Sequence, residues 1–270
     1  MHSNRIITFI IILLIGGAWM LPSCTNFIAD VDLQDDWQVK ESGKIRLYYR
    51  AGGFSGKPSP GDELAEKIVE NQNIYYRAIL DTLKRSFNDK ILIYLYNEDE
   101  AEELIGTNTG GHAIPKYNCF YYTYLSGLPS LEDRYGVDNR VIGAHELAHV
   151  ITHRILGYPG TKLMSEGYAV WLDGTYGGCP IEDIIRKYRD KEPEKIMSPD
   201  ALLNEQVDKE AVYYPNAGVL LGYWAHAYGI APINLIFSSR RETLKDDFRK
   251  VTGVDWQEMS AQYEQYLNEL

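Results

Sequence analysis

The stretch at residues 138–156, DNRVIGAHELAHVITHRIL, decides how the fold of this 270-residue chain is interpreted. It predicts an amphipathic helix ending at Gly157, because its apolar residues recur at helical spacing: Val141, Ala144, Ala148, Ile151 and Ile155. Within it, His145 and His149 are four positions apart, so both imidazoles lie on one face of the helix. Two imidazoles in that arrangement can bind one metal ion.

Glu146 follows the first histidine directly, one step round the same helix. From that position its carboxylate can reach a water molecule on the metal without being a ligand itself. A chain with 6 histidines and 38 acidic residues contains about 0.02 His-Glu-x-x-His matches by chance. The pattern therefore predicts a catalytic metal site; the alternative is a structural metal on a polar helix face.

A catalytic zinc site with two histidines needs a third protein ligand and leaves its fourth position to water. His153 is on the same helix, but about 12 Å of axial rise separates it from His145, which is too far to share the ion. Glu166 lies 17 residues after His149, across a Gly/Pro loop and near the start of a helix predicted over 163–172. A helix–loop–helix turn can return its carboxylate to the histidines, so it is the expected third ligand. The alternative is a first-turn acid that only favours its own helix.

Two elements, HELAH at 145–149 and MSEGYAVWL at 164–172, resemble the gluzincin metallopeptidases. The resemblance is to the small extracytoplasmic bacterial proteins of the peptidase-MA-like family, and it covers most of the chain from about residue 44 to 270. It implies the α+β class with a zincin-like metallopeptidase fold, and one Zn²⁺ ion per chain. By this resemblance the residues of the site are His145, His149 and Glu166 as zinc ligands and Glu146 as general base.

Hydrolysis of a peptide bond passes through an oxyanion, which needs a hydrogen-bond donor beside the metal. Tyr214 is the first candidate, because the family has a tyrosine before its C-terminal helix. Tyr213 and His226 are the weaker alternatives. Some gluzincins also orient a ligand histidine with an aspartate four residues after the third ligand; that position here is Val170, and Asp173 is the expected replacement.

The sequence before the metal motif predicts a mixed sheet. Short β-branched and aromatic runs predict strands at 44–50 and 90–96, with a helix between them. A third strand is expected at 112–124, where Pro115 cannot donate a ladder hydrogen bond and so belongs at a sheet edge. By resemblance, residues 111–124 are the edge strand to which an extended peptide pairs.

Endopeptidase activity is expected rather than aminopeptidase activity. Gluzincin aminopeptidases carry an acidic residue in the edge-strand motif, where it holds the substrate amine. The matching stretch here, GGHAIPKYN at 110–118, has no acidic residue.

After the metal motif the apolar periods are helical. A short acidic helix is expected earlier, over 97–106, and further helix boundaries are expected at Ser198, Pro215, Gly229 and Asp255. The layout is α+β, with one metallopeptidase domain over 44–270. This domain divides into lobes at about 44–157 and 158–270, with the cleft expected between them.

The first 23 residues are expected to be an export signal and no part of the fold. Arg5 precedes an uncharged, mostly apolar run of 16 residues, which is shorter than the roughly 20 residues of a membrane-spanning helix. The run ends at Leu-Pro-Ser-Cys, and Cys24 resembles the lipidated cysteine of bacterial lipoproteins; an uncleaved anchor is the alternative. Residues 24–43 are expected to form an acidic tether. The expected location is therefore extracytoplasmic, lipid-anchored to a bacterial membrane.

The charge balance limits the partners. With 27 basic and 38 acidic residues the net charge is -11, which disfavours nucleic acid and makes contact with a membrane depend on the lipid alone. A peptide or protein substrate is the expected partner. Cys119 and Cys179 could form a disulfide outside the cytoplasm, but the sequence gives no distance between them and leaves the pairing open.

Two other functions are compatible with the same motif. One is a surface binding module that holds zinc without catalysis, which the complete motif with Glu146 disfavours because such a module has no need of a base. The other is a hydrolase acting on a cell-wall peptide amide, which shares the zinc chemistry and differs only in what fits the cleft.

Overall fold

The computed structural model describes residues 37–50, 61–97, 101, 110–124, 142–205 and 209–270. All of them belong to the unit Asp36–Leu270. This unit combines a mixed sheet with helices and is of the α+β class, as the sequence predicts. The export signal with Cys24, and most of the acidic helix expected at 97–106, lie outside the described residues.

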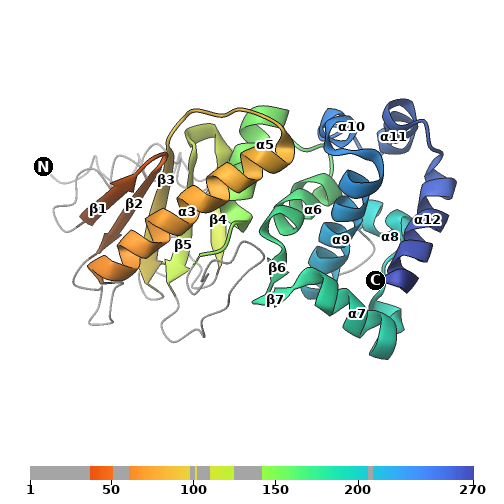
Figure 1. Cartoon of the computed structure of the whole chain (residues 1–270), viewed down its shortest axis with the longest axis horizontal. Coiled ribbons are helices and arrows are strands. Elements are labelled where there is room, and N and C mark those ends of the chain that lie inside the picture. The colour runs from red at the N-terminus through yellow and green to blue at the C-terminus, as the bar shows by residue number, and fades with distance from the viewer. Residues whose placement is uncertain (1–36, 51–60, 98–100, 102–109, 125–141, 206–208) are drawn as a thin grey trace, which may run out of the picture. The chain divides into compact units, whose positions relative to one another are not determined.

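A five-stranded sheet has the strand order β1-β2-β3-β5-β4 (Figure 1). Its three central strands pair in parallel, and β1 and β4 are antiparallel edge strands. The bounds are β1 Trp37–Ser42, β2 Ile45–Arg50, β3 Ile91–Asn97, β4 Gly111–Ile114 and β5 Cys119–Tyr124. Helix α3, Asp62–Leu83, connects β2 to β3 and packs against β1 and β2. The strands predicted at 44–50 and 90–96 are thus confirmed.

Every second residue of β2 and β3 belongs to the main hydrophobic core, as expected where successive side chains point to opposite faces of a sheet. These residues are Ile45, Leu47, Tyr49, Ile91, Ile93 and Leu95. The same core includes one apolar face of α3, with Ile68, Tyr75, Ile79 and Leu83. The strand–helix–strand unit is therefore stabilised by burial of its β-branched and aromatic side chains.

The acidic tether expected at 24–43 is wrong for its last part, because Trp37–Ser42 forms β1 and pairs with β2 along its length. Glu41 forms ion pairs with Arg46 and with Lys90. The one acidic side chain of β1 is thus paired with a cation on β2 and with one just before β3. The folded unit begins by Trp37 rather than at residue 44.

The single strand expected at 112–124 is in fact two strands. β4 pairs antiparallel with β5, with Ile114 opposite Cys119, and a short 3₁₀ turn at Pro115–Tyr117 joins them. Asn118 completes the reversal in the left-handed region with φ 53°, a conformation that asparagine tolerates better than most residues. Pro115 therefore opens a turn, and of the two strands only β4 lies at an edge of the sheet, with β5 inside it.

Helix α5, His145–Leu156, begins seven residues later than Asp138, where the sequence places its start. Ile142 to Ala144 are not helical, and residues 138–141 lie outside the described part. The buried amide of Gln72 on α3 donates to the carbonyl oxygens of Ile142 and Gly143, at 3.2 and 3.0 Å. Because the Gln72 side chain hydrogen-bonds these two carbonyl groups, the helix begins after them, at His145, the first residue of the metal motif.

Helix α9, Glu210–Tyr228, begins five residues before Pro215, which the sequence places at its start. A proline within a helix leaves the carbonyl group four residues earlier without its usual N–H donor. That carbonyl belongs to Ala211, and the hydroxyl of Tyr188 donates to it at 3.1 Å. Because the Tyr188 hydroxyl takes the place of the missing N–H donor, the helix can extend on the N-terminal side of Pro215.

The other helices have the bounds α6 Lys162–Asp173, α7 Ile181–Lys191, α8 Pro199–Leu203, α10 Ile230–Leu235, α11 Leu244–Thr252 and α12 Trp256–Glu269. Short turns and strands complete them: β6 Thr175–Tyr176, β7 Cys179–Pro180 and a 3₁₀ turn at Pro193–Lys195. The predicted boundaries at Ser198, Gly229 and Asp255 are confirmed, since Ser198 and Asp255 cap helices with their side chains and Gly229 ends α9.

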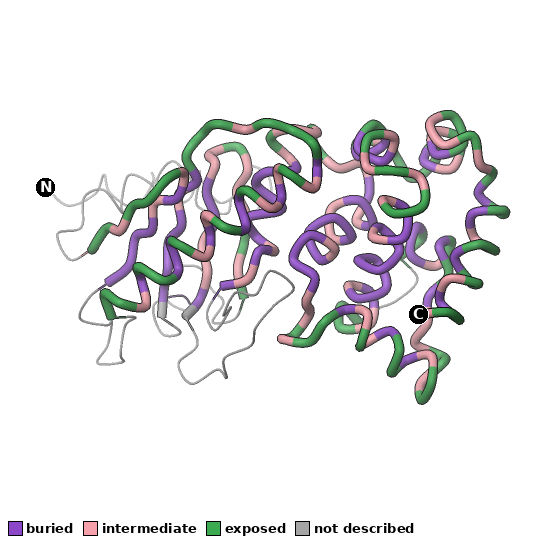
Figure 2. Tube along the Cα trace, viewed as in Figure 1, coloured by how far each residue is buried: buried purple, intermediate pink, exposed green. Residues whose placement is uncertain are grey.

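Helices α6 and α9 pack closely, and Figure 2 shows most of both as buried. Two glycines permit this approach. A methyl group added at Gly167 would lie 2.6 Å from the Leu221 side chain, and one at Gly218 would lie 2.6 Å from Val170. Helix α6 also contacts α5, so it packs against both α9 and the metal-motif helix.

Neither of the two described cysteines is in a disulfide; Cys119 is buried and Cys179 is exposed. The disulfide that the sequence leaves open is therefore not formed. Among the helices that the structure describes, none combines the length and the apolar character needed to cross a bilayer.

Candidate metal centre

Two neighbouring helices bring the three predicted ligands together. His145 is the first residue of α5, His149 lies one turn further, and Glu166 is in the second turn of α6. The loop between the helices is anchored, because the N–H of Gly160 donates to the carbonyl oxygen of Phe237 at 3.1 Å. Thr161 then caps α6 by accepting a hydrogen bond from the Met164 N–H. This short, fixed connection returns Glu166 to the histidines.

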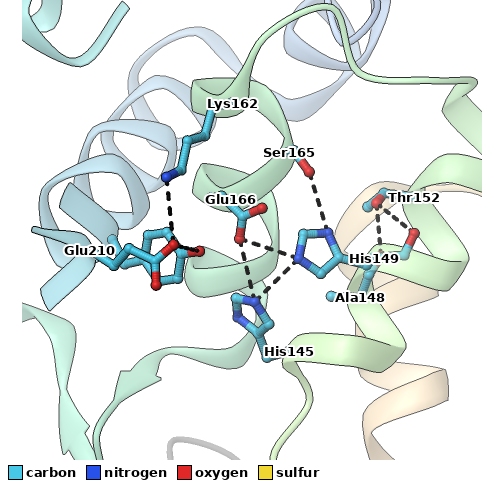
Figure 3. Close-up of polar contacts among 9 residues, drawn as sticks. His145, Ala148, His149, Thr152, Lys162, Ser165, Glu166 and Glu210 are labelled. Carbon is cyan, nitrogen blue, oxygen red and sulfur yellow. Dashed lines mark hydrogen bonds and ion pairs between the residues drawn. The ribbon is translucent and has the colours of Figure 1, made fainter. Parts of the chain in front are cut away.

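The ligand atoms form a nearly equilateral triangle (Figure 3). The His145 and His149 Nε2 atoms are 3.2 Å apart, and Glu166 Oε2 lies 3.5 Å from the first and 3.3 Å from the second. A tetrahedral zinc ion with bonds of about 2.0–2.1 Å places neighbouring ligand atoms roughly 3.3 Å apart. His145, His149 and Glu166 can thus hold a metal ion, and their spacing fits the size of zinc.

The electrostatics of the three side chains suit a cation. Burial opposes the charged form of Glu166, but hydrogen bonds with His145 and His149 outweigh it and lower the pKa of the carboxyl group. Burial likewise acts to lower the pKa of His145, yet the hydrogen bond with Glu166 and the charges of Glu146 and Asp173 raise it overall. The site is therefore electron-rich: without a metal it attracts protons, and a bound cation would take their place.

Glu146 is buried beside this group and is not part of it. Its side chain lies against the edge strand: a methyl group added at Gly111 would be 2.6 Å from the Glu146 Cγ atom and equally close to Tyr122. Glycine at 111 is thus required by the close approach of β4 to the glutamate. The carboxylate lies between the ligand helix and the sheet edge.

Tyr214 is the candidate oxyanion donor that the structure brings to the centre. Its ring stacks beside His145 with centroids 6.1 Å apart, and its hydroxyl donates to Glu210 at 3.2 Å. Burial, together with the carboxylates of Glu166 and Glu210, raises its pKa, so the phenol stays protonated and able to donate.

The two alternative donors lie elsewhere. Tyr213 is buried and its hydroxyl donates to the carbonyl oxygen of Leu202 at 3.0 Å, which makes it a packing residue. His226 is exposed on α9, twelve residues after Tyr214, which corresponds to about 18 Å along the helix.

Asp173 supports the start of α5. Its carboxylate accepts hydrogen bonds from the N–H of Ala144 and from the hydroxyl of Thr175. It thereby fixes the residue immediately before His145. The expected role of Asp173, direct orientation of a ligand imidazole, stays a prediction.

Three further residues at the centre are not among the sequence candidates. Ser165 Oγ lies 3.5 Å from His149 Nδ1, where it can support the ring nitrogen opposite the metal. Lys162 Nζ lies 3.7 Å from Glu210 Oε1 (Figure 3), and Glu210 accepts the hydrogen bond of the Tyr214 hydroxyl. Ser165 could have been predicted from the sequence, because it directly precedes Glu166. No local signal connects Lys162 to Glu210, which are 48 positions apart.

His153 lies close to the centre without joining the ligand group, as the sequence predicts. Its ring is 5.8 Å from that of His149, centroid to centroid, and also contacts Phe237. Burial lowers the pKa of His153 to about 4. It is therefore a neutral aromatic packing residue at neutral pH.

No protein-family model matches this chain, and a search of curated protein sequences returns no match. The functional argument accordingly rests on the residues of the centre and on their geometry.

Proposed function

We propose that this chain is a zinc-dependent metallopeptidase of zincin-like fold, related to the gluzincins, that hydrolyses peptide bonds as an endopeptidase. The observation that carries the proposal is the triangle of His145, His149 and Glu166 with sides of 3.2–3.5 Å, with Glu146 buried directly beside it. Two histidines and one glutamate are a ligand set used by catalytic zinc sites, which keep one position open.

The chain's own residues divide the remaining chemistry among them. A bound zinc ion would supply Lewis acidity, which makes water more acidic and polarises a carbonyl group. Glu146 accepts the proton of the attacking water and passes it to the leaving amine. Tyr214 turns its protonated hydroxyl from Glu210 to the carbonyl oxygen as negative charge develops there.

The sheet edge supports the choice of a peptide as substrate. Strand β4 pairs with β5 on one side, and among the described strands none pairs with its other side. Gly111 of β4 packs against Glu146, so a peptide that extends the sheet along β4 would pass beside the general base. The proposal includes an extracytoplasmic location with a lipid on Cys24, on the sequence argument alone.

The test is metal analysis combined with cleavage of a mixed peptide library by the zinc-loaded full chain. Wild type is expected to bind one zinc per chain and to cleave peptides. Glu146→Gln is expected to keep the zinc and to lose about 10²–10⁴-fold in rate, because the amide cannot accept a proton. Glu264→Gln, an exposed position on α12, is the matched control and should be fully active. Equal activity of wild type and Glu146→Gln, or no cleavage by zinc-loaded wild type, contradicts the proposal.

A further inference from the structure

A pocket of about 430 Å³ opens beside Glu166, the third metal ligand. Its wall consists of the loop at 159–161, then Lys162 and Ser165 from the first turn of α6, and Glu205 and Arg241 from outside that helix. Glu166 lines this pocket and also belongs to the ligand group, so the pocket adjoins the metal centre. The proposed steps of peptide hydrolysis do not involve this pocket.

Two cations line this pocket, and each is paired with a glutamate. Lys162 Nζ lies 3.7 Å from Glu210 and 5.4 Å from the ring centroid of Tyr214. The Arg241 guanidinium pairs with Glu205 at 2.5 Å. Their side chains keep exposed fractions of 36% and 47%, so each retains N–H donors for another partner. A guanidinium has five donors and an ammonium three, more than one glutamate occupies.

The net charge around the pocket depends on whether a metal ion is bound to Glu166. Without it, Lys162 and Arg241 are balanced by Glu205 and Glu210, and Glu166 leaves an excess of negative charge. A divalent ion on Glu166 reverses this balance and makes the surroundings positive. The positive end of α6, which begins at Lys162, adds to the same sign. An anion is thus favoured in the loaded protein.

We propose that this pocket binds a carboxylate group of the peptide substrate, held by Lys162 and Arg241. The proposal rests on the proposed peptidase function and names its substrate class. The carboxylate can come from an acidic side chain near the scissile bond or from the C-terminus of a short peptide. A basic side chain is disfavoured, because it would have to approach two cations.

The test measures binding to zinc-loaded full chain carrying Glu146→Gln, in which peptides bind without being cut. Alanine-based hexapeptides, acetylated and amidated, carry one Glu, one Gln or one Lys at each position in turn. A second arm compares free-acid with amidated C-termini on the same peptides. The structure predicts about five- to tenfold tighter binding of a carboxylate in one arm, the gain expected from a partly exposed charged contact. The arm that shows the gain identifies its source.

Variants then assign the contact to the pocket. Lys162→Gln and Arg241→Gln, each added to Glu146→Gln, should bring the affinity ratio close to one, whereas Lys162→Arg should keep it. Lys187→Gln removes a lysine from a comparable pair with Glu192, at 3.3 Å on α7, and should leave the ratio unchanged. Zinc content of every variant is measured alongside, so that loss of the centre is recognised.

The proposal is overturned by three results: equal affinity for carboxylate and amide peptides, including no binding of either; a preference that survives both Gln variants; or tighter binding of lysine peptides. The peptidase function is judged separately, by cleavage with zinc-loaded wild type. A carboxylate preference in the Glu146→Gln background together with no cleavage by wild type would retain the pocket and reject the peptidase.

Discussion

The Nε2 atoms of His145 and His149 lie 3.2 Å apart, with a carboxylate oxygen of Glu166 at a similar distance from both. Three electron-rich atoms held this closely repel each other unless a proton or a metal ion lies among them. Helical spacing predicts the two histidines, because residues four apart share a face. The spacing does not predict Ser165 or Glu210, which reach the centre through tertiary packing.

Tyr214 and Tyr213 provide a matched pair of single-atom changes. Tyr214→Phe is expected to lower kcat by about 10²-fold, with KM and zinc content nearly unchanged, because the lost hydrogen bond forms mainly in the transition state. Tyr213→Phe removes the hydrogen bond to Leu202 instead and should lower the free energy of unfolding by about 1 kcal/mol without changing kcat. Steady-state kinetics and denaturant unfolding check both. Retention of full kcat by Tyr214→Phe would exclude this tyrosine as the oxyanion donor.

The metal-free centre should depend on pH in a defined direction. Contacts within the site raise the pKa of His145 above 6.5 and lower that of Glu166 below 4.5. The histidine contribution to stability is full below 6.5 and is lost as the pH rises through the raised pKa. The glutamate contribution is present above 4.5 and is lost as the pH falls through the lowered pKa. The two overlap between 4.5 and 6.5.

The measurement is the difference in unfolding free energy between metal-free wild type and metal-free Glu166→Gln. We expect wild type to gain more from Glu166 at about pH 5.5 than at about pH 8.5, since the His145 contribution is full at the lower pH and is lost as the pH rises through its raised pKa. A wild-type advantage that increases toward pH 8.5 would show that the charged pair does not form.

Among the elements, the loop between α5 and α6 determines where Glu166 lies. Gly160 packs on the backbone of the chain near α10: a methyl group there would lie 2.1 Å from the Ser239 carbonyl oxygen. Backbone atoms cannot move aside as a side chain can, so the loop itself must shift. The position of Glu166 therefore depends on how this loop packs against the chain that follows α10.

Gly160→Ala is accordingly expected to lower the free energy of unfolding by about 1–3 kcal/mol and to weaken zinc binding. The matched control is Gly61→Ala at the start of α3, where an added methyl group meets nothing within 4 Å. Thermal unfolding and competition with a chelator measure the two effects. If Gly160→Ala binds zinc as wild type does, the loop does not position Glu166.

Element boundaries show where the sequence is insufficient. The strands β2 and β3 and the helix α6 follow from local periodicity, and they are confirmed. The start of α9 does not, because the carbonyl group that Pro215 leaves unpaired is bound by Tyr188, 27 positions away. The sequence likewise does not separate β4 from β5, because both lie in one run of strand-forming residues. Only Pro115 and Asn118 mark the turn between them.

At the scale of the whole molecule, the α+β class is predictable, since strands precede helices in the sequence. The start of the folded unit is not, because β1 directly follows an acidic stretch of sequence, and the partners of its Glu41 are Arg46 on β2 and Lys90 just before β3. The net charge of -11 belongs to the chain as a whole and does not predict the charge around the metal centre. With zinc bound, the pocket of Lys162 and Arg241 would be a positive region on an acidic chain.

The X-ray absorption spectrum of the zinc-loaded full chain tests the metal centre most directly. Metal analysis of the same sample should give one zinc per chain, and the spectrum should show two imidazole nitrogens, oxygen ligands at about 2.0–2.2 Å and no sulfur. His149→Ala and Glu166→Gln should each lose zinc at equal free metal concentration, whereas His153→Phe should keep it. A spectrum with sulfur ligands, or zinc retained by His149→Ala with an unchanged imidazole count, would contradict the assignment of His145, His149 and Glu166 as the metal ligands.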